Sequence, residues 1–112
     1  MKFERELLKG VAPTIVLEIL SRGRMYGYEL SDAIEQRSEK ILTLGRGTLY
    51  PLLYNLEAKE LVTAQWQVSE NGRKRRYYEI TGKGKAKLSA QKEQWVQLQQ
   101  GVNLVFNQLR PV

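Results

Sequence analysis

The sequence contains no cysteine and no histidine. Without cysteine it has no disulfide and no thiolate chemistry, and without histidine it lacks the commonest general base and metal ligand. Its acidic residues are scattered, mostly at the spacing of helix surfaces. It also has neither a P-loop nor a complete dinucleotide-binding glycine pattern. These absences predict that the chain is not an enzyme and carries no metal or cofactor.

Long apolar runs are missing as well. The longest are only a few residues, so no segment is predicted to span a membrane. The opening stretch MKFERELLKG mixes acids with bases and precedes no apolar block, unlike a secretory signal. With the lack of cysteine, this predicts a cytoplasmic protein. The 112 residues, 42% of them hydrophobic, are typical of a globular chain with one modest core.

Positive charge is concentrated in the second half of the chain. The formal net charge is +6; residues 1–60 hold nine bases and nine acids, whereas residues 61–112 hold nine bases and three acids. Residues 73–92 alone carry eight bases against Glu79. A local excess of this kind is typical of a protein that binds a polyanion. A solvated surface kept for solubility is the ordinary alternative.

Apolar periodicity predicts three helices in the first half. Residues 7–21 are strongly apolar and predict a short lead segment, a break or kink near Gly10–Pro13, and then a buried helix. SRGRMYG is interpreted as a connection, and GYELSDAIEQRS as a short amphipathic helix. A third helix, from about Gly47 to Glu60, has one leucine face: Leu49, Leu52, Leu53 and Leu56, spaced i, i+3, i+4, i+7.

Over residues 62–80 the apolar period changes from about 3.6 to 2, which is typical of strands. Asn71-Gly72 is a strong turn signal, because glycine adopts positive φ without steric cost. A two-residue loop there would place the return strand's apolar residues on the wrong face. A loop one residue longer, with Gly72 left-handed, pairs Trp66 with Tyr78 on the buried face.

The last helix is predicted over residues 82–109, capped by Thr81 and about 42 Å long at 1.5 Å per residue. One side of it has heptad spacing with a single polar position, Gln91. So small a domain cannot cover this seam, which is therefore predicted to meet a second copy. A helix folded back on its own core is the alternative, and Gly101 permits it. The predicted dimer interface comprises Leu88, Trp95, Leu98, Val102, Val105, Phe106 and Leu109.

Three helices followed by a hairpin predict a mainly α fold with a small β-hairpin (α+β), a winged helix-turn-helix over residues 1–81. Residues 82–112 form the dimerisation helix. The third helix then occupies the place of a recognition helix, and the cationic hairpin suits phosphates or the minor groove. Arg76 is expected to face inward. The predicted DNA-binding residues are Arg46, Thr48, Tyr50, Pro51, Tyr54, Asn55, Arg73, Lys74 and Arg75.

Three stretches, MYGYEL (25–30), GTLYPLLYNLEAKELV (47–62) and GRKRRYYEIT (72–81), resemble in order and spacing the signatures of PadR-family transcriptional regulators. The single long last helix resembles the short-form subgroup. The resemblance implies a homodimeric repressor that binds double-stranded DNA. In such a protein the last helices of the two copies form the dimer. The stretch LTLGRG departs from the polar cap common in the family, which leaves the start of the recognition helix and the place of Pro51 open.

Trp95 has two interpretations. In one multidrug-sensing branch of the family, a tryptophan at about this place sandwiches flat ligands with its dimer mate. That implies a small aromatic effector at the interface. The other interpretation is a core tryptophan in the helix seam, which the sequence slightly favours. The sequence does not decide between an aromatic effector and no effector.

Two other functions fit the same layout. One is a winged-helix module for protein contacts, with cations that are only solvated. The other is an RNA-binding module, which would show exposed aromatic side chains on its sheet. Because the aromatic residues of the hairpin are predicted to be buried, DNA binding is favoured. A two-fold dimer then predicts a pseudo-palindromic operator with half-sites about 34–36 Å apart, or a multiple of that distance.

Overall fold

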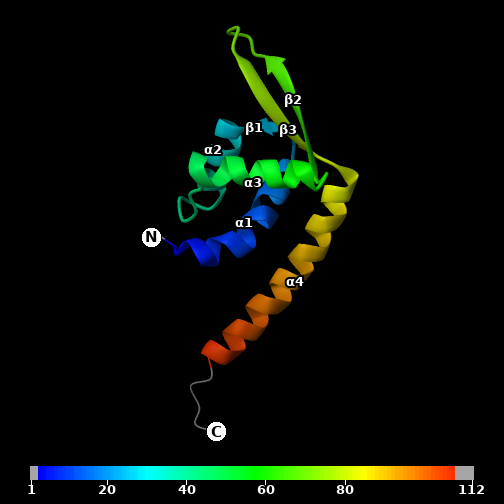
Figure 1. Cartoon of the computed structure of the whole chain (residues 1–112). Helices are drawn as coiled ribbons and strands as arrows, with labels where there is room; N and C mark the ends of the chain where they lie inside the picture. Colours follow the sequence, from blue (N-terminus) through cyan, green and yellow to red (C-terminus); the bar gives the residue numbers. More distant parts are fainter. Residues whose placement is uncertain (1–2, 108–112) are drawn as a thin grey trace.

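The computed structural model describes residues 3–107. Within them four helices and one antiparallel sheet follow in mixed order (Figure 1). The fold is the expected α+β winged helix-turn-helix with a long C-terminal helix. The elements are α1 (Arg5–Leu20), β1 (Met25–Tyr26), α2 (Gly27–Arg37), α3 (Arg46–Ala58), β2 (Val62–Val68), β3 (Lys74–Ile80) and α4 (Gly82–Phe106).

The core lies where α1, α2, α3 and the base of the sheet meet. Each helix contributes the apolar stripe that its sequence spacing predicts. Burying these side chains is the main stabilising contribution, at about 25 cal/mol per Å² of apolar surface. The fully buried side chains include Val16, Leu17, Leu20, Leu30, Ile34, Leu44, Leu49, Leu53 and Val62.

Pro13 lies inside α1 and does not divide it. Of the two alternatives that the sequence left open near Gly10–Pro13, a break is excluded, because α1 is helical from Arg5 to Leu20. Figure 1 shows the helix bending before its C-terminal half, so the kink alternative is the one observed. Proline cannot donate a backbone hydrogen bond to the preceding turn, and helices accommodate such a residue by bending.

The sheet has a third strand that the sequence analysis missed. The strands lie in the order β1-β3-β2. Met25 pairs with Tyr78 and Tyr26 with Tyr77. The sequence predicts only a connection here, because two residues are too few to show strand periodicity. Its pairing depends on β3, which is about 50 residues away and brought alongside only by the fold.

The β2–β3 hairpin, which we call the wing, has a register two residues away from the predicted one. Trp66 lies opposite Arg76 instead of Tyr78, which pairs with Ala64. The loop has three residues as predicted, between paired Ser69 and Arg73. Gly72 has a φ of 80°, so its left-handed conformation is confirmed. A shift of two residues keeps each side chain on its predicted face.

The buried face of the wing extends only along its base. Val62 and Tyr78 are in the core, whereas the Trp66 side chain is 67% exposed. Figure 1 shows why, since the outer part of the wing projects beyond the helices. The expectation that the hairpin's aromatic residues are all buried is therefore wrong for Trp66.

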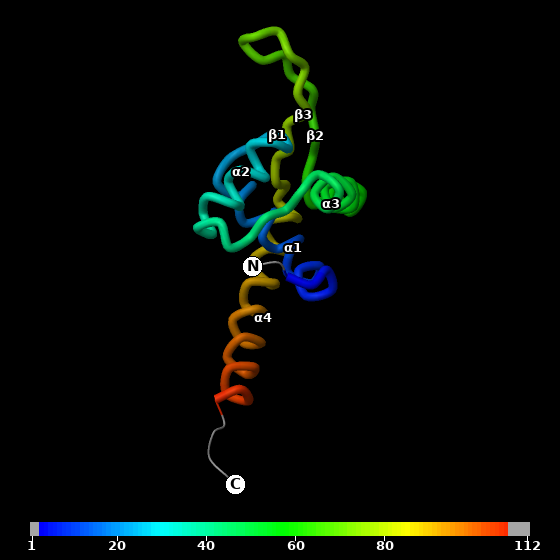
Figure 2. The backbone as a smooth tube through the Cα atoms, turned by 90° about the vertical axis from the view of Figure 1, so that its left-hand side faces the viewer, coloured from blue at the N-terminus to red at the C-terminus, as the bar shows by residue number. Residues whose placement is uncertain are grey.

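Helix α4 begins as predicted and then leaves the body of the molecule. The Thr81 hydroxyl accepts a hydrogen bond from the Gly84 amide at 2.9 Å, which confirms Thr81 as the N-cap. Gly84 is buried, and a Cβ there would collide with the carbonyl oxygen of Leu61. The helix continues through Gly101 to Phe106, and Figures 1 and 2 show α4 running away from the core without folding back on it. The folded-back alternative is therefore excluded for the part described.

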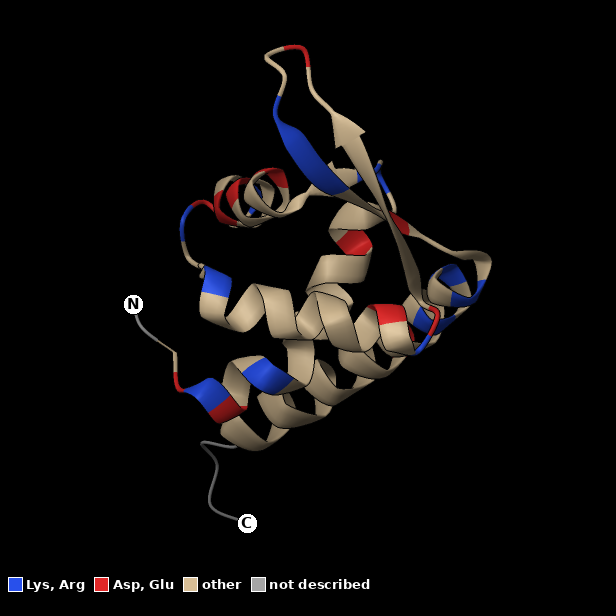
Figure 3. Cartoon of the chain, turned by 45° about the horizontal axis from the view of Figure 1, so that its top comes forward, with Lys and Arg blue, Asp and Glu red and all other residues tan. Residues whose placement is uncertain are grey.

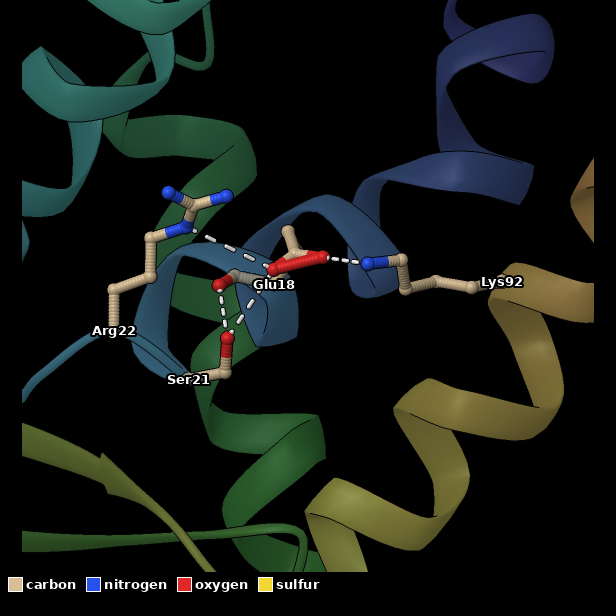
Figure 4. A network of polar contacts seen from close by, with 4 residues as sticks. All are labelled: Glu18, Ser21, Arg22 and Lys92. Atoms are coloured by element: carbon tan, nitrogen blue, oxygen red, sulfur yellow. Dashed lines mark hydrogen bonds and ion pairs between the residues drawn. The ribbon is translucent and has the colours of Figure 1, made fainter.

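Polar contacts attach α4 to α1 beyond the apolar core. Lys92 forms an ion pair with Glu18, which also accepts a hydrogen bond from Ser21 and lies 3.9 Å from Arg22 (Figure 4). The hydrogen bond from Lys92 lowers the pKa of the Glu18 carboxyl, although partial burial opposes the shift. One turn earlier on α1, the Thr14 hydroxyl donates to Gln91 Oε1 at 2.6 Å. The polar position of the heptad seam is thus partnered within the chain.

Candidate nucleic-acid interface

Helix α3 presents its predicted DNA-facing residues to solvent. Leu49, Leu53 and Leu56 are buried, and Leu52 is half-buried against the same core. The helical period therefore turns the opposite face outward. All six residues predicted on or beside this helix are exposed: Arg46, Thr48, Tyr50, Pro51, Tyr54 and Asn55.

The start of α3 resolves the place of Pro51. The helix begins at Arg46, with Gly45 as an N-cap that supplies no side-chain hydrogen bond. Pro51 is therefore in the second turn, inside the helix. Its ring nitrogen cannot donate to the carbonyl of Gly47, so that carbonyl lacks its usual helical partner. This polar group lies on the exposed face.

The four consecutive cations of the wing point to different environments. Arg73 and Lys74 are exposed near the tip, whereas Arg75 and Arg76 are half-buried. Arg75 Nη1 donates to the Tyr26 hydroxyl at 2.6 Å, and its guanidinium carbon lies 4.3 Å from the centre of that ring. A DNA contact by Arg75 therefore has to accommodate its attachment to β1.

Arg76 faces inward, as the sequence predicts, and connects the wing to α3. Its Nη2 atom donates to both carboxylate oxygens of Glu57, at 2.9 and 3.1 Å. The guanidinium carbon lies 5.6 Å from the centre of the Tyr78 ring and 6.0 Å from that of Tyr54. Arg76 Nε is buried and has no hydrogen-bond partner in the part of the chain described. These contacts brace α3 against the wing.

A cleft of about 340 Å³ lies between α3 and the wing, and we call it the α3–wing cleft. Its aromatic lining includes Tyr50 and Tyr54 from α3 and Trp66 from β2. Burial raises the pKa of Tyr78, deeper in the same cleft, so its hydroxyl is neutral at physiological pH. Lys74, Arg75 and Arg76 supply positive charge.

Trp66 is the residue of this surface that sequence reasoning missed. The alternation of β2 placed it correctly on the same face as Ala64. The alternation predicts that this face is buried along its whole length, but it is buried only at the base. The signal that was available is the cation-rich return strand, because a strand paired with so many charged residues is more typical of an exposed wing than of a core.

Charged side chains are distributed unevenly over this side of the molecule. Figure 3 shows a continuous blue stretch on β3 and another at the start of α3, while red residues gather on α2. Residues 3–107 contain no group of three acidic, histidine or cysteine side chains placed to hold a metal ion. None of their helices is long and apolar enough to cross a membrane.

The seam of α4 is open to solvent from Trp95 onward. Trp95 is 45% exposed and Leu98 58%, and the apolar residues of the next two turns are exposed as well. Leu88 instead packs in the core of its own chain. Its share in an interface between copies stays a prediction, and Leu109 lies outside the described residues. The exposed members of the predicted interface are Trp95, Leu98, Val102, Val105 and Phe106.

Comparisons with known proteins agree with this arrangement. A family model described as "Transcriptional regulator PadR-like family" matches residues 16–90. The chain is similar to a PadR-like transcriptional regulator from Bacillus cereus, with a TM-score of 0.78, 33% identity and coverage of 91% of this chain and 97% of that one.

Two further proteins are similar over nearly the same length. A transcriptional regulator from Clostridium thermocellum has a TM-score of 0.81 and 28% identity, covering 88% of this chain and 95% of that one. An uncharacterized protein of Lysinibacillus sphaericus is 32% identical over 104 residues, 93% of this chain and 95% of its own length. The residues matched by the family model include all of α3 and the wing.

Proposed function

The chain belongs to the PadR-like family of transcriptional regulators, and on that premise we propose that it is a homodimeric repressor of a pseudo-palindromic operator. Membership of this family means that the chain is a transcriptional regulator and not an enzyme. The lack of histidine had pointed in the same direction. The observation that carries the proposal is an exposed aromatic face on α3 beside a cationic wing.

In this proposal α3 enters the major groove and the wing follows the adjacent backbone. Thr48, Tyr50 and Tyr54 have hydroxyls that donate to phosphates, and Asn55 has an amide that reads base edges. Arg73 and Lys74 carry exposed charges suited to phosphate contacts. Arg46 adds a cation at the start of α3.

The proposed division of labour is a DNA-binding unit over residues 1–81 and a dimerisation helix over residues 82–112. The open seam of α4 supports it, since Leu98 is 58% exposed, Val102 is 37% exposed, and neither belongs to the core of the described chain. Burying such side chains against a second copy offsets the cost of association. The protein would act on chromosomal DNA in the cytoplasm.

An aromatic effector at the dimer interface is a secondary part of the proposal. Trp95 is 45% exposed in the single chain, so a second copy or a flat ligand between two copies would cover it. Both interpretations of this residue place it in the seam between two copies.

The test is capture of genomic fragments by the purified protein, followed by sequencing. The expected result is enrichment of a pseudo-palindrome whose half-sites lie about one or two helical turns apart. Weak capture of fragments without a shared motif would contradict operator recognition. Deleting the gene then distinguishes repression from activation. Repression predicts that transcripts beside the enriched sites rise in the deletion strain.

A further inference from the structure

We propose that the α3–wing cleft holds one sugar-phosphate strand of duplex DNA, with Trp66 packed against the sugars and Lys74 against a phosphate. This inference rests on the proposed function and adds a contact residue and a role for the cleft. It starts from Trp66, which lies within β2 and whose side chain is 67% exposed.

The walls of the cleft come from two elements that the fold fixes relative to one another. Tyr54 belongs to α3 and is 66% exposed, while Trp66 belongs to β2. Arg76 pairs with Trp66 across the wing. Its guanidinium donates two hydrogen bonds to the Glu57 carboxylate of α3. The bottom of the cleft is therefore braced, and its aromatic rims stay apart.

The charges of the cleft identify the occupant as an anion with apolar edges. Glu57 neutralises Arg76, and Arg75 is hydrogen-bonded to Tyr26. Lys74 is exposed and forms no ion pair within residues 3–107. A sugar-phosphate strand offers a phosphate for Lys74 and C–H edges of deoxyribose for the aromatic rings.

The position of the cleft favours a duplex over a single strand. A recognition helix in the major groove and a wing at the neighbouring backbone have one strand between them. A single-stranded binder instead stacks successive bases on aromatic side chains along a groove. Here the exposed ring of the sheet stands alone on its face of β2, with Ala64 towards the core and Val68 towards the tip.

The experiment compares the wild type with Trp66→Phe and Trp66→Ala. The chain has two tryptophans, Trp66 and Trp95. A change in tryptophan emission that DNA causes in the wild type but not in Trp66→Phe therefore comes from Trp66. Duplex DNA should protect wild-type tryptophan emission from acrylamide quenching, and this protection should be lost in Trp66→Phe. Trp66→Ala should weaken binding to operator and random duplex by the same factor, about tenfold for a lost aromatic contact.

Two controls separate the cleft from general effects. Trp66→Ala removes no cation, so the salt slope of binding should be unchanged. Gln65→Ala, the exposed neighbour on the other face of β2, should bind duplex like the wild type. Thermal melting of each variant checks that the fold is intact.

The possible failures are distinguishable. If the wild type binds duplex but Trp66→Ala binds equally well and emission is unprotected, the inference is wrong and the proposed function stands. If single-stranded DNA or RNA of the same length protects Trp66 more than duplex does, the cleft holds single strands and the inference is overturned. If no duplex binds the wild type, the proposed function itself fails.

Discussion

At the scale of single residues, the neighbours of a cation decide what it does. Four cations follow one another from Arg73 to Arg76, yet two are open to solvent and two are attached to other side chains. Arg76 pairs with Glu57 of α3, and Arg75 donates a hydrogen bond to Tyr26 of β1. Charge density alone therefore overstates the number of free phosphate contacts.

The first residue-scale prediction tests the two faces of α3. Tyr54→Ala should leave melting nearly unchanged, because the side chain is 66% exposed, and should weaken operator binding by about 1–3 kcal/mol. Leu53→Ala should lose about 2–5 kcal/mol of stability, because that side chain is fully buried. Melting and operator affinity measured on both variants check this. An unfolded Tyr54→Ala beside a silent Leu53→Ala would mean that the DNA-facing surface is wrongly assigned.

A second residue-scale prediction concerns Glu18 and pH. Because Lys92 lowers the pKa of Glu18 below its ordinary value of 4.5, the ion pair stabilises the folded chain above that pH. Its contribution is lost as the pH falls through the lowered pKa. Glu18→Gln should therefore be less stable than the wild type at pH 7, by about 0.2–1 kcal/mol for a largely solvated pair.

Urea unfolding of the wild type and Glu18→Gln from pH 7 to pH 3 measures this difference. The gap should close towards the acidic end. Glu93→Gln on α4, next to Lys92 but exposed and in no ion pair among the described residues, is the control for losing a carboxylate. A gap that persists unchanged at pH 3 would show that the carboxylate charge is not what stabilises α4 against α1.

At the scale of elements, the wing combines a rigid base with a charged outer part. Its base is paired on both sides of β3, by β1 and β2, and carries Tyr78 into the core. Its outer part carries Trp66, Arg73 and Lys74, whose side chains are exposed. A wing built this way keeps its direction while its cations stay available to an anion.

The element-scale prediction separates the free cations of the wing from the attached one. Arg73→Ala and Lys74→Ala should each flatten the salt dependence of DNA binding by about 0.9 in log–log slope, for operator and random duplex alike. Arg75→Ala should change this slope less and lower melting instead, because its hydrogen bond to Tyr26 joins β3 to β1. Affinity titrations at several salt concentrations provide the measurement. Equal slopes in all three variants and the wild type would exclude phosphate contacts by the wing.

At the scale of the whole molecule, α4 joins the winged helix-turn-helix to a seam whose apolar side chains are exposed from Trp95 to Phe106. Its first turns belong to the core through Gly84 and Leu88. Farther along, Gln91 and Lys92 hold α1 by polar contacts. The position of the seam relative to α3 is therefore fixed, which is what a two-fold operator with one half-site spacing requires.

The whole-molecule prediction is that charge in the seam separates the copies. Val102→Glu should shift the protein from dimer to monomer at micromolar concentration, because a buried carboxylate is costly. Gln100→Glu adds the same charge on the opposite side of the helix and should leave the dimer intact. Sedimentation of both variants and the wild type decides the matter. In Val102→Glu, operator affinity should fall together with the fraction of dimer. A wild type that sediments as a monomer would contradict the predicted dimer.

The sequence by itself determined the features that depend on neighbours in the chain. The spacing of leucines fixed α3 and its outward face, Thr81 capped α4, and Gly72 took the left-handed position in the wing. The same local patterns placed the predicted recognition-helix residues on one exposed surface, with Tyr54 at its centre. Periodicity and backbone preference are short-range, so they are already present before the chain folds.

Only the tertiary structure decided the features that depend on distant segments. Strand β1 exists because β3 lies beside it, and the wing register follows from where Tyr78 enters the core. Helix α1 continues through Pro13 because its later turns are buried, whereas local preference would end it there. Trp66 is exposed because the wing extends beyond the core. Leu88 is buried because the first turns of α4 pack against Leu61. Burial and strand register are set by long-range packing, which periodicity along the chain does not encode.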